Sequence, residues 1–275
     1  MLLDGKKVSD EKCVILKKQI KNLTFKPALA VIQVGNDLAS DVYVRQKRNF
    51  ALKLDIKFEH YKLNENISEN EIISIIKKLN MRKDINGIVL QLPLPKSFDE
   101  NKLLNLIDSD KDVDGLTDIN NGRLWKDSDG LIPCTAKGII SLLNYYDISL
   151  LGKRVAIVGR SILVGKPLAA LFLNEDATVT ICHSKTKNLK SILLESDIII
   201  VAVGKANFIT EDMIKEGTII VDAGINITEN GLVGDVHFED VKDKALYITP
   251  VPGGVGPMTV YSLMENVIEV CKKIN

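Results

Sequence analysis

The sequence has few of the residues that build metal centres or disulfide frameworks. Among 275 residues there are three histidines and four cysteines. The histidines are scattered, and no two cysteines form the close pairs that zinc sites and redox motifs need. We therefore predict no metal site and expect the cysteines to be reduced thiols in a cytoplasmic protein. These residues are His60, His183, His237, Cys13, Cys134, Cys182 and Cys271.

Excess charge and long apolar runs are also absent. Lysine plus arginine and aspartate plus glutamate both total 36, so no bulk field attracts a nucleic acid or an anionic membrane. The first residues, MLLDGKKVSDEK, lack the apolar stretch of a signal peptide, and no run approaches the roughly 20 apolar residues of a membrane span. We therefore expect a cytoplasmic protein whose partner is a small molecule, with no nucleic acid and no membrane involved.

The second half contains short apolar runs without alternation, which is typical of strands buried on both faces of a sheet. These runs are residues 155–159, 177–182, 198–203 and 218–222. Helix-like stretches lie between them, at 166–174 and 189–196. A strand, helix, strand order repeated at intervals of about 20 residues predicts a doubly wound parallel sheet of the Rossmann type.

The first half repeats this α/β pattern more loosely, and we predict a separate domain there. Strands are predicted at 28–34, 56–63 and 87–92, with helices near 37–54 and 68–81. We place the domain boundary near Asp118, which gives an α/β substrate domain over 1–118 and a Rossmann domain over 119–275. The segment 258–274 is an amphipathic helix that we expect to pack back on the first domain.

One strand of the second half leads into a turn suited to a dinucleotide. Residues 155–169 read VAIVGRSILVGKPLA, a buried strand followed by a tight turn and a helix start. Gly159 and Gly165 permit close backbone approach, and the N–H groups of the new helix attract a pyrophosphate. Ser161 holds the second glycine position of G-x-G-x-x-G, and the spacing to Gly165 is longer. A plain strand-to-helix turn is the alternative interpretation.

The end of the following strand favours NADP over NAD. Proteins that bind NAD carry an Asp or Glu roughly 20 residues past the loop, where it accepts the ribose hydroxyls. His183, Ser184 and Lys185 stand there instead. Arg160, Ser184 and Lys185 offer donors and positive charge to a 2′-phosphate. The alternative is that Arg160 and Lys185 are ordinary solvated charges.

Polar residues of the first half are candidates for the chemistry. Ser40, Tyr43 and Lys47 are spaced i, i+3 and i+7, which places them on one face of a helix. Gln91 ends an apolar run, GIVL, at the carboxyl end of a predicted strand. In the turn KDVDG, Asp112 and Asp114 flank a valine, so one carboxylate can point inward and the other toward solvent.

A tyrosine four residues before a lysine also occurs in short-chain dehydrogenases, where it transfers a proton. In that family the pair follows the dinucleotide loop, whereas Tyr43 and Lys47 precede Gly159. The order argues against this alternative. A half-buried tyrosine beside a solvated lysine is the structural interpretation of the same spacing.

Taken together, these motifs resemble the bifunctional methylenetetrahydrofolate dehydrogenase/methenyltetrahydrofolate cyclohydrolase family. The resemblance covers nearly the whole chain, and its segments follow the family's order. They are YVRQK at 43–47, GIVLQLPLP at 87–95, KDVDG at 111–115, IPCTAKG at 132–138, VGRSILVGKP at 158–167, TICHSKT at 180–186 and TPVPGGVGPMT at 249–259.

The resemblance implies a two-step reaction in one-carbon metabolism. NADP oxidises 5,10-methylenetetrahydrofolate to the methenyl cation, and water then converts the cation to 10-formyltetrahydrofolate. The catalytic residues that it implies are Lys47 as general acid-base, Gln91 and Tyr43 as positioning groups, and Asp114 as the anchor of the pterin. A charged ammonium would be repelled by the cationic substrate, so we expect Lys47 to act partly neutral. A folate- or dinucleotide-binding protein without catalysis is the alternative from another class.

The resemblance also implies the binding residues and a homodimer. Cofactor contacts are expected at Gly159, Arg160, Ser161, Gly165, Ser184 and Ile225, with Ser184 at the 2′-phosphate and Ile225 at the nicotinamide half. Substrate contacts are expected at Ser40, Tyr43, Lys47, Leu90, Gln91, Leu92, Asp114, Pro252, Gly253, Gly254, Gly256, Pro257 and Thr259. Asp112 is expected to form the turn, and Cys134 and Cys182 to be buried packing residues.

Overall fold

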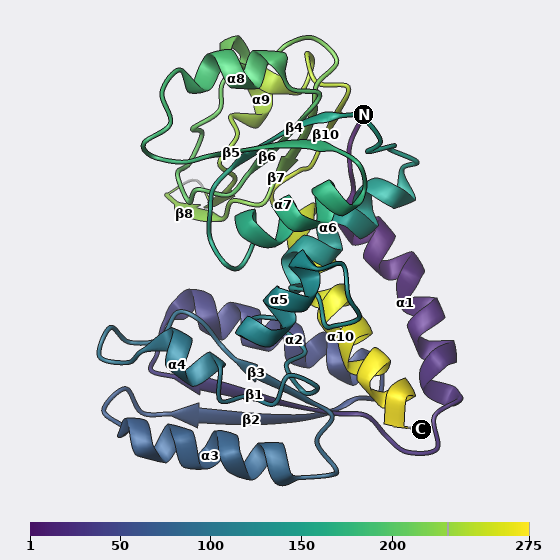
Figure 1. The fold of residues 1–275 in the computed structure, drawn as a ribbon, viewed down its shortest axis with the longest axis vertical. Coiled ribbons are helices and arrows are strands. Elements are labelled where there is room, and N and C mark those ends of the chain that lie inside the picture. Colours follow the sequence, from purple (N-terminus) through teal and green to yellow (C-terminus); the bar gives the residue numbers. More distant parts are fainter. Residues whose placement is uncertain (230, 275) are drawn as a thin grey trace. The chain divides into compact units, whose positions relative to one another are not determined.

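The chain forms two units, each built around its own parallel β-sheet (Figure 1). The computed structural model describes residues 1–229 and 231–274. Lys12–Cys134 and the segment from Val260 form one unit, which we call the three-strand unit. Met1–Glu11 and Thr135–Thr259 form the other, which we call the five-strand unit. The predicted α/β class with parallel sheets is confirmed.

The three-strand unit has its central strand fully buried. Its sheet has the order β2-β1-β3, and all pairs are parallel. The strands are β1 (Ala28–Val34), β2 (Lys57–Leu63) and β3 (Gly87–Leu90). Every residue of β1 is buried, as its unbroken apolar run predicts. The strand predicted at 87–92 is shorter in the structure: it ends at Leu90, and Gln91 lies just beyond its carboxyl end.

Helices of the three-strand unit bury their apolar residues against this sheet. Ile72 and Ile76 of α3 (Glu69–Met81) pack in one core with Ala30 and Ile32 of β1. A capping box between Ser68 and Glu71 fixes the start of α3. The other helices here are α2 (Leu38–Lys53), α4 (Glu100–Leu104) and α5 (Asp118–Trp125).

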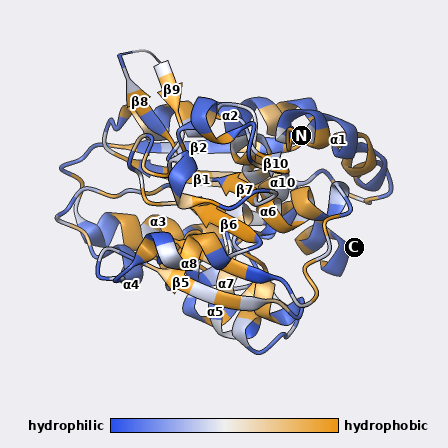
Figure 2. Ribbon diagram, turned by 90° about the horizontal axis from the view of Figure 1, so that it is seen from above, coloured by the Kyte–Doolittle hydropathy of each residue, from blue (hydrophilic) through white to orange (hydrophobic). Residues whose placement is uncertain are grey.

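The five-strand unit is a parallel sheet with the strand order β10-β7-β6-β4-β5. The strands are β4 (Arg154–Val158), β5 (Thr178–Cys182), β6 (Ile198–Val201), β7 (Ile219–Asp222) and β10 (Tyr247–Ile248). From β4 the chain goes to β5 on one side and then returns to β6 on the other. Ligands of such sheets bind where the order reverses, beyond the carboxyl ends of the strands. Figure 2 shows the hydrophobic colouring of β6 and β7, which are buried along their full length.

Smaller elements complete the five-strand unit. They are α7 (Gly165–Asn174), α8 (Leu189–Glu195), a 3-10 turn (Glu211–Met213), α9 (Phe238–Val241) and the antiparallel hairpin of β8 (Asn226–Thr228) and β9 (Gly231–Val233). The amino-terminal residues pair with β10, because the Leu3 N–H donates to the Ile248 carbonyl at 2.9 Å. None of the described helices is long and apolar enough to cross a membrane.

The two units divide the chain differently from the predicted boundary at Asp118. Residues 119–134 belong to the three-strand unit, where Asn120 donates its side-chain amide to the Asp112 carboxylate at 3.0 Å. Helices α5, α9, α1 (Gly5–Lys21) and α6 (Cys134–Tyr145) were not predicted from the sequence. Helix α10 (Val255–Ile274) begins three positions before the predicted 258.

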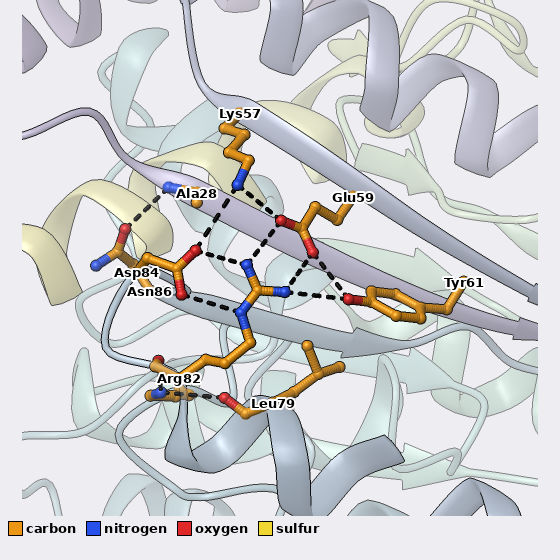
Figure 3. Close-up of polar contacts among 9 residues, drawn as sticks. Ala28, Lys57, Glu59, Tyr61, Leu79, Arg82, Asp84 and Asn86 are labelled. Atoms are coloured by element: carbon orange, nitrogen blue, oxygen red, sulfur yellow. Dashed lines mark hydrogen bonds and ion pairs between the residues drawn. The ribbon is translucent and has the colours of Figure 1, made fainter.

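A polar network joins the loop after α3 to β2 in the three-strand unit (Figure 3). The Arg82 guanidinium donates to both Glu59 oxygens at 2.6 and 2.9 Å, and also to Asp84. Lys57 lies 2.8 Å from the same Glu59 carboxylate. Hydrogen bonds from Arg82 are the largest cause that lowers the pKa of Glu59, from 4.5 to about 2. This two-point contact holds the chain before β3 in register.

The network predicts how the free energy of unfolding changes as the pH is lowered. Glu59 has a folded-state pKa below its unfolded value, so its contribution is complete above pH 4.5 and is lost as the pH falls toward about 2. The free energy of unfolding, measured by urea titration across this range, should fall less in Glu59→Gln than in the wild type. Glu195→Gln, which alters an exposed pair with Arg154, is the control. Equal acid dependence in wild type and Glu59→Gln would contradict the assignment.

Candidate active site

The amine of Lys47 is buried in the three-strand unit and has an amide partner. Its Nζ donates to Gln91 Oε1 at 3.0 Å, and Lys47 is only 6% exposed. Gln91 in turn donates its Nε2 to the Leu92 carbonyl at 2.8 Å. That bond fixes which end of the amide faces the lysine. The carboxylate of Asp114 lies 3.9 Å from the same amine.

Helix α2 places Ser40 and Lys47 on one buried face. The Asp37 side chain caps the helix by accepting the Ser40 N–H at 2.7 Å. The Ser40 hydroxyl reaches the Leu92 carbonyl at 3.5 Å, so α2 and the segment after β3 are joined at two points. Tyr43 lies one turn before Lys47 and is half-buried, and burial raises the pKa of the Tyr43 phenol.

The two aspartates of KDVDG have different surroundings. Asp112 is buried and accepts the N–H groups of Leu116 and Thr117 at 3.1 and 2.8 Å. Asp114 is half-buried and faces Lys47. Asp112 therefore forms the turn, as predicted from the sequence, and leaves Asp114 as the carboxylate beside the amine.

Residues that the sequence interpretation missed hold the Asp114 turn in place. Asn266 of α10 donates to the carbonyls of Val113 and Ile132 at 2.8 and 2.9 Å, and it is fully buried. Cys134 Sγ also contacts the Val113 carbonyl, at 3.2 Å. The only signal for Asn266 was a polar residue on the apolar face of the last helix, where Ser262 lies one turn earlier and is also buried. The burial of Asn266 requires satisfied hydrogen bonds, and the turn supplies them.

This group of side chains suits proton transfer near a bound molecule. An amine can give or take a proton, and Gln91 limits the directions in which its N–H groups point. A carboxylate such as Asp114 can accept two hydrogen bonds from a planar ligand that carries adjacent N–H groups. Leu90 is buried at the end of β3, so in this structure its side chain belongs to the core.

The turn after β4 in the five-strand unit needs its two glycines. Gly159 has φ +137°, and a Cβ there would lie 2.4 Å from the Ala202 carbonyl oxygen. A Cβ on Gly165 would lie 2.2 Å from the Gly159 carbonyl oxygen. Ser161 accepts the Val164 N–H at 3.2 Å, and Val164, which precedes α7, gives no side-chain cap to that helix. The tight turn and the open helix start agree with the predicted phosphate loop.

The turns that follow β4, β5 and β7 meet at one edge of the sheet. The Gly159 N–H donates to the Cys182 carbonyl at 2.9 Å, which joins the first two of them. Arg160 and Ser184 are exposed beyond these strands, and Ile225 is 40% exposed beyond β7. The backbone after β5 is ordered around His183, whose Nδ1 accepts the Lys185 N–H at 3.2 Å. Donors and positive charge are thus available at this edge.

The glycine-rich segment before α10 is partly helical. Gly256, Pro257 and Thr259 lie in the first turns of α10, because the helix begins at Val255. A proline is tolerated there, since the first N–H groups of a helix have no intrahelical acceptor. Pro252 and Gly253 lie in the preceding turn, and the Gly253 carbonyl accepts the Lys6 N–H at 2.9 Å.

The same turn is packed against the start of α1. A Cβ on Gly5 would lie 1.9 Å from the Gly254 carbonyl oxygen, so both backbones approach closely. Thr259 bonds to Thr135 at 3.3 Å between hydroxyl oxygens. Among the residues that the structure describes, no group of three or more His, Cys, Asp or Glu side chains could hold a metal ion.

Comparison with known proteins identifies the family. Residues 3–114 match the model of the tetrahydrofolate dehydrogenase/cyclohydrolase catalytic domain, and residues 133–275 match that of its NAD(P)-binding domain. The chain belongs to the tetrahydrofolate dehydrogenase/cyclohydrolase family. It is an enzyme with the two domains of this family, as the sequence motifs predicted. The alternative of a short-chain dehydrogenase is set aside.

Individual relatives agree with membership of the tetrahydrofolate dehydrogenase/cyclohydrolase family. The bifunctional protein FolD of Thermodesulfovibrio yellowstonii is 50% identical, with 98% of this chain and 96% of the relative covered. The crystal structure of the bifunctional enzyme FolD from Campylobacter jejuni has a TM-score of 0.98 at 45% identity, covering 100% of this chain and 99% of that one. FolD of Trypanosoma brucei, solved with NADP cofactor and an inhibitor, has a TM-score of 0.95 at 33% identity and covers 100% and 98%.

Replacing Gly159 by alanine tests the turn after β4. The added methyl group meets the Ala202 carbonyl, and the positive φ is unfavourable for alanine, so the free energy of unfolding should fall by about 2 kcal/mol or more. Dinucleotide binding, followed by fluorescence titration, should weaken as well. Gly122→Ala is the control, since a Cβ there meets nothing within 4 Å. Unchanged stability and binding in Gly159→Ala would show that the turn is tolerant.

Proposed function

We propose that this enzyme oxidises 5,10-methylenetetrahydrofolate with NADP and then hydrolyses the methenyl product to 10-formyltetrahydrofolate. Membership of the tetrahydrofolate dehydrogenase/cyclohydrolase family supports both activities. The observation that carries the proposal is the buried Lys47 amine, 3.0 Å from Gln91 and 3.9 Å from Asp114. A binding protein without catalysis has no need to bury an amine in this arrangement.

The residues of the five-strand unit fit a dinucleotide. Because Gly159 and Gly165 have no side chain, a pyrophosphate can approach the backbone of this turn closely. The start of α7 offers N–H groups to the pyrophosphate. When bound, NADP accepts the hydride that leaves the one-carbon unit of the substrate. We assign Arg160, Ser161 and Ser184 to the phosphates, as a 2′-phosphate needs donors and positive charge.

The oxidation step does not need a strong base from the protein. The nitrogen lone pairs next to the methylene carbon stabilise the amidinium that forms when a hydride leaves, so correct placement of the substrate is most of the work. We assign Asp114 to the pterin N–H groups and Tyr43 to the substrate beside Lys47. The three-strand unit is then the folate-binding unit and the five-strand unit is the dinucleotide-binding unit. We also propose, as predicted from the sequence, that the last helix packs on the first domain, residues 1–118.

The hydrolysis needs a proton carrier. Water adds to the methenyl carbon and gives up both of its protons as the formyl C=O forms. One proton goes to the nitrogen that departs from that carbon, and the other is released to solvent. We assign this transfer to Lys47, with Gln91 holding the amine in position. We further propose that Ser40, Leu92 and the segment 252–259 contact the folate, and that Leu90, whose side chain lies in the core, does so through its main chain.

We also propose a cytoplasmic homodimer, in which the formyl product feeds purine and amino-acid biosynthesis. The four cysteines are free and buried, which suits a reducing compartment. Many FolD proteins of bacteria are close to this chain in sequence. Sedimentation of the purified protein at several concentrations would test the dimer.

Lys47→Met is the sharpest test of the hydrolytic step. Loss of the amine should lower the rate of methenyltetrahydrofolate hydrolysis by about 10²-fold or more, because the proton carrier is gone. Folate binding, measured by calorimetry, should persist. Arg48→Met, an exposed change on the same helix, should retain hydrolysis. Undiminished hydrolysis in Lys47→Met would remove Lys47 from its role.

Arg160→Ala tests the choice of NADP. If the guanidinium contacts the 2′-phosphate, its loss should raise the KM for NADP about tenfold or more, and the KM for NAD should change little. The assay follows formation of the reduced dinucleotide from methylenetetrahydrofolate. Arg154→Ala removes another exposed arginine of the same unit and serves as the control. Equal effects on both dinucleotides would mean that Arg160 does not discriminate between them.

A further inference from the structure

A buried carboxylate lies beneath the carboxyl edge of the five-strand sheet, and no sequence motif drew attention to it. Asp235 is completely buried and accepts four N–H groups. Its Oδ2 accepts from Val203 N at 2.6 Å and Gly204 N at 2.9 Å. Its Oδ1 accepts from Lys205 N at 2.8 Å and Asn226 Nδ2 at 2.9 Å. Only an acceptor with two free oxygens satisfies all four donors.

These bonds tie two neighbouring turns together. Residues 203–205 follow β6, and Asn226 follows β7 after a short turn. The two strands are adjacent and parallel, with Val201 opposite Asp222. The carboxyl group of Asp235 packs directly on the second turn, because a Cβ on Gly224 would lie 2.1 Å from Asp235 Cγ. Asp235 therefore sets the path of the backbone on both sides of residue 225.

A second buried carboxylate holds Asp235 itself. Asp222 accepts the N–H groups of Gly224, Asp235 and Val236 at 2.8, 3.0 and 2.8 Å. A Cβ on Gly234 would lie 1.9 Å from Asp222 Oδ2, so this carboxylate also packs against backbone. Burial is the largest cause that raises the pKa of Asp222 to about 6, and the neighbouring Asp235 adds to it. Keeping two carboxylates this close is costly, which suggests a role beyond packing.

Between the anchored Gly224 and Asn226, Ile225 points outward. Its side chain is 40% exposed although both neighbours are fixed by buried carboxylates. A hydrophobic side chain held out on such a backbone is pre-organised to contact a flat ligand.

We propose that Asp235 is a positioning residue for the oxidative half-reaction. By joining the turns after β6 and β7, it holds Ile225 in the place from which it contacts the nicotinamide half of NADP. This inference rests on the proposed function, in which NADP binds at this edge. Asp235 itself touches neither the dinucleotide nor the folate.

Asp235→Asn tests the proposal, because the amide nitrogen places a donor against donors. The dehydrogenase kcat should fall about tenfold or more, with a smaller change in the KM for NADP, since the phosphate contacts lie elsewhere. Hydrolysis of methenyltetrahydrofolate, assayed with no dinucleotide present, should stay within about twofold of the wild type. Ile225→Ala should show the same division between the two activities. Asp212→Asn, an exposed aspartate of the same unit paired with Lys190, should change neither.

The double variant Asp235→Asn/Asn226→Asp exchanges the carboxylate and the amide between the two positions. It should restore part of the dehydrogenase kcat that Asp235→Asn loses. If both activities fall equally in Asp235→Asn, or if oxidation is unchanged, the proposal is overturned. If Asp235→Asn does not fold by circular dichroism, Asn226→Ala decides, because it removes one of the four donors. Retained oxidation in a folded Asn226→Ala would then overturn the proposal. A wild-type enzyme with neither activity would instead refute the proposed function.

Discussion

The hydrogen bond from the buried Lys47 amine to Gln91 is the contact on which the proposed chemistry depends. An amine taken out of water needs a partner, and Gln91 Oε1 supplies it at 3.0 Å. The amide is itself oriented by the Leu92 carbonyl. The Asp37 cap fixes the start of the helix that carries the lysine. A flexible side chain is thereby restricted to one place, which is what proton transfer to a bound folate requires.

Both units use the same feature of parallel sheets. Strands that run in one direction end at one edge, so the residues that follow them gather there. Gln91 follows β3 in the three-strand unit. Gly159, Ser184 and Ile225 follow β4, β5 and β7 in the five-strand unit. The apolar strands supply a rigid base, and the variable turns carry the polar groups. The buried carboxylate of Asp235 then fixes the turn after β6 by accepting its backbone N–H groups, and Asp112 fixes the KDVDG turn in the same way.

The sequence predicted the parts of the fold that depend on local pattern. Unbroken apolar runs predicted the buried strands β1, β3, β4, β6 and β7, and the glycine spacing predicted the turn whose close contacts Gly159 and Gly165 allow. Helix α5 was not predicted because its sequence, DINNGRLW, is mostly polar. Its position depends on a tertiary hydrogen bond from Asn120 to Asp112. The early start of α10 was hidden by Gly256 and Pro257, residues that usually interrupt helices.

The candidate site was predicted less evenly. Ser40, Lys47 and Gln91 could be placed from helical spacing and strand ends, and the family resemblance assigned their roles. Asn266 contacts the carbonyl of Val113, which is far away along the chain. Asp235 contacts the turn after β6, and no local sequence pattern shows the path of that turn. Only the folded backbone shows that these polar residues are buried and fully bonded.

A double-variant cycle on Lys47 and Gln91 tests the central claim most directly. Rates of methenyltetrahydrofolate hydrolysis would be compared among the wild type, Lys47→Met, Gln91→Leu and the combination of the two. If Gln91 acts by holding the amine, its replacement should matter little once Lys47 is gone, and the combined loss should be close to that of Lys47→Met alone. Losses that multiply would contradict the account, because the two residues would then act independently.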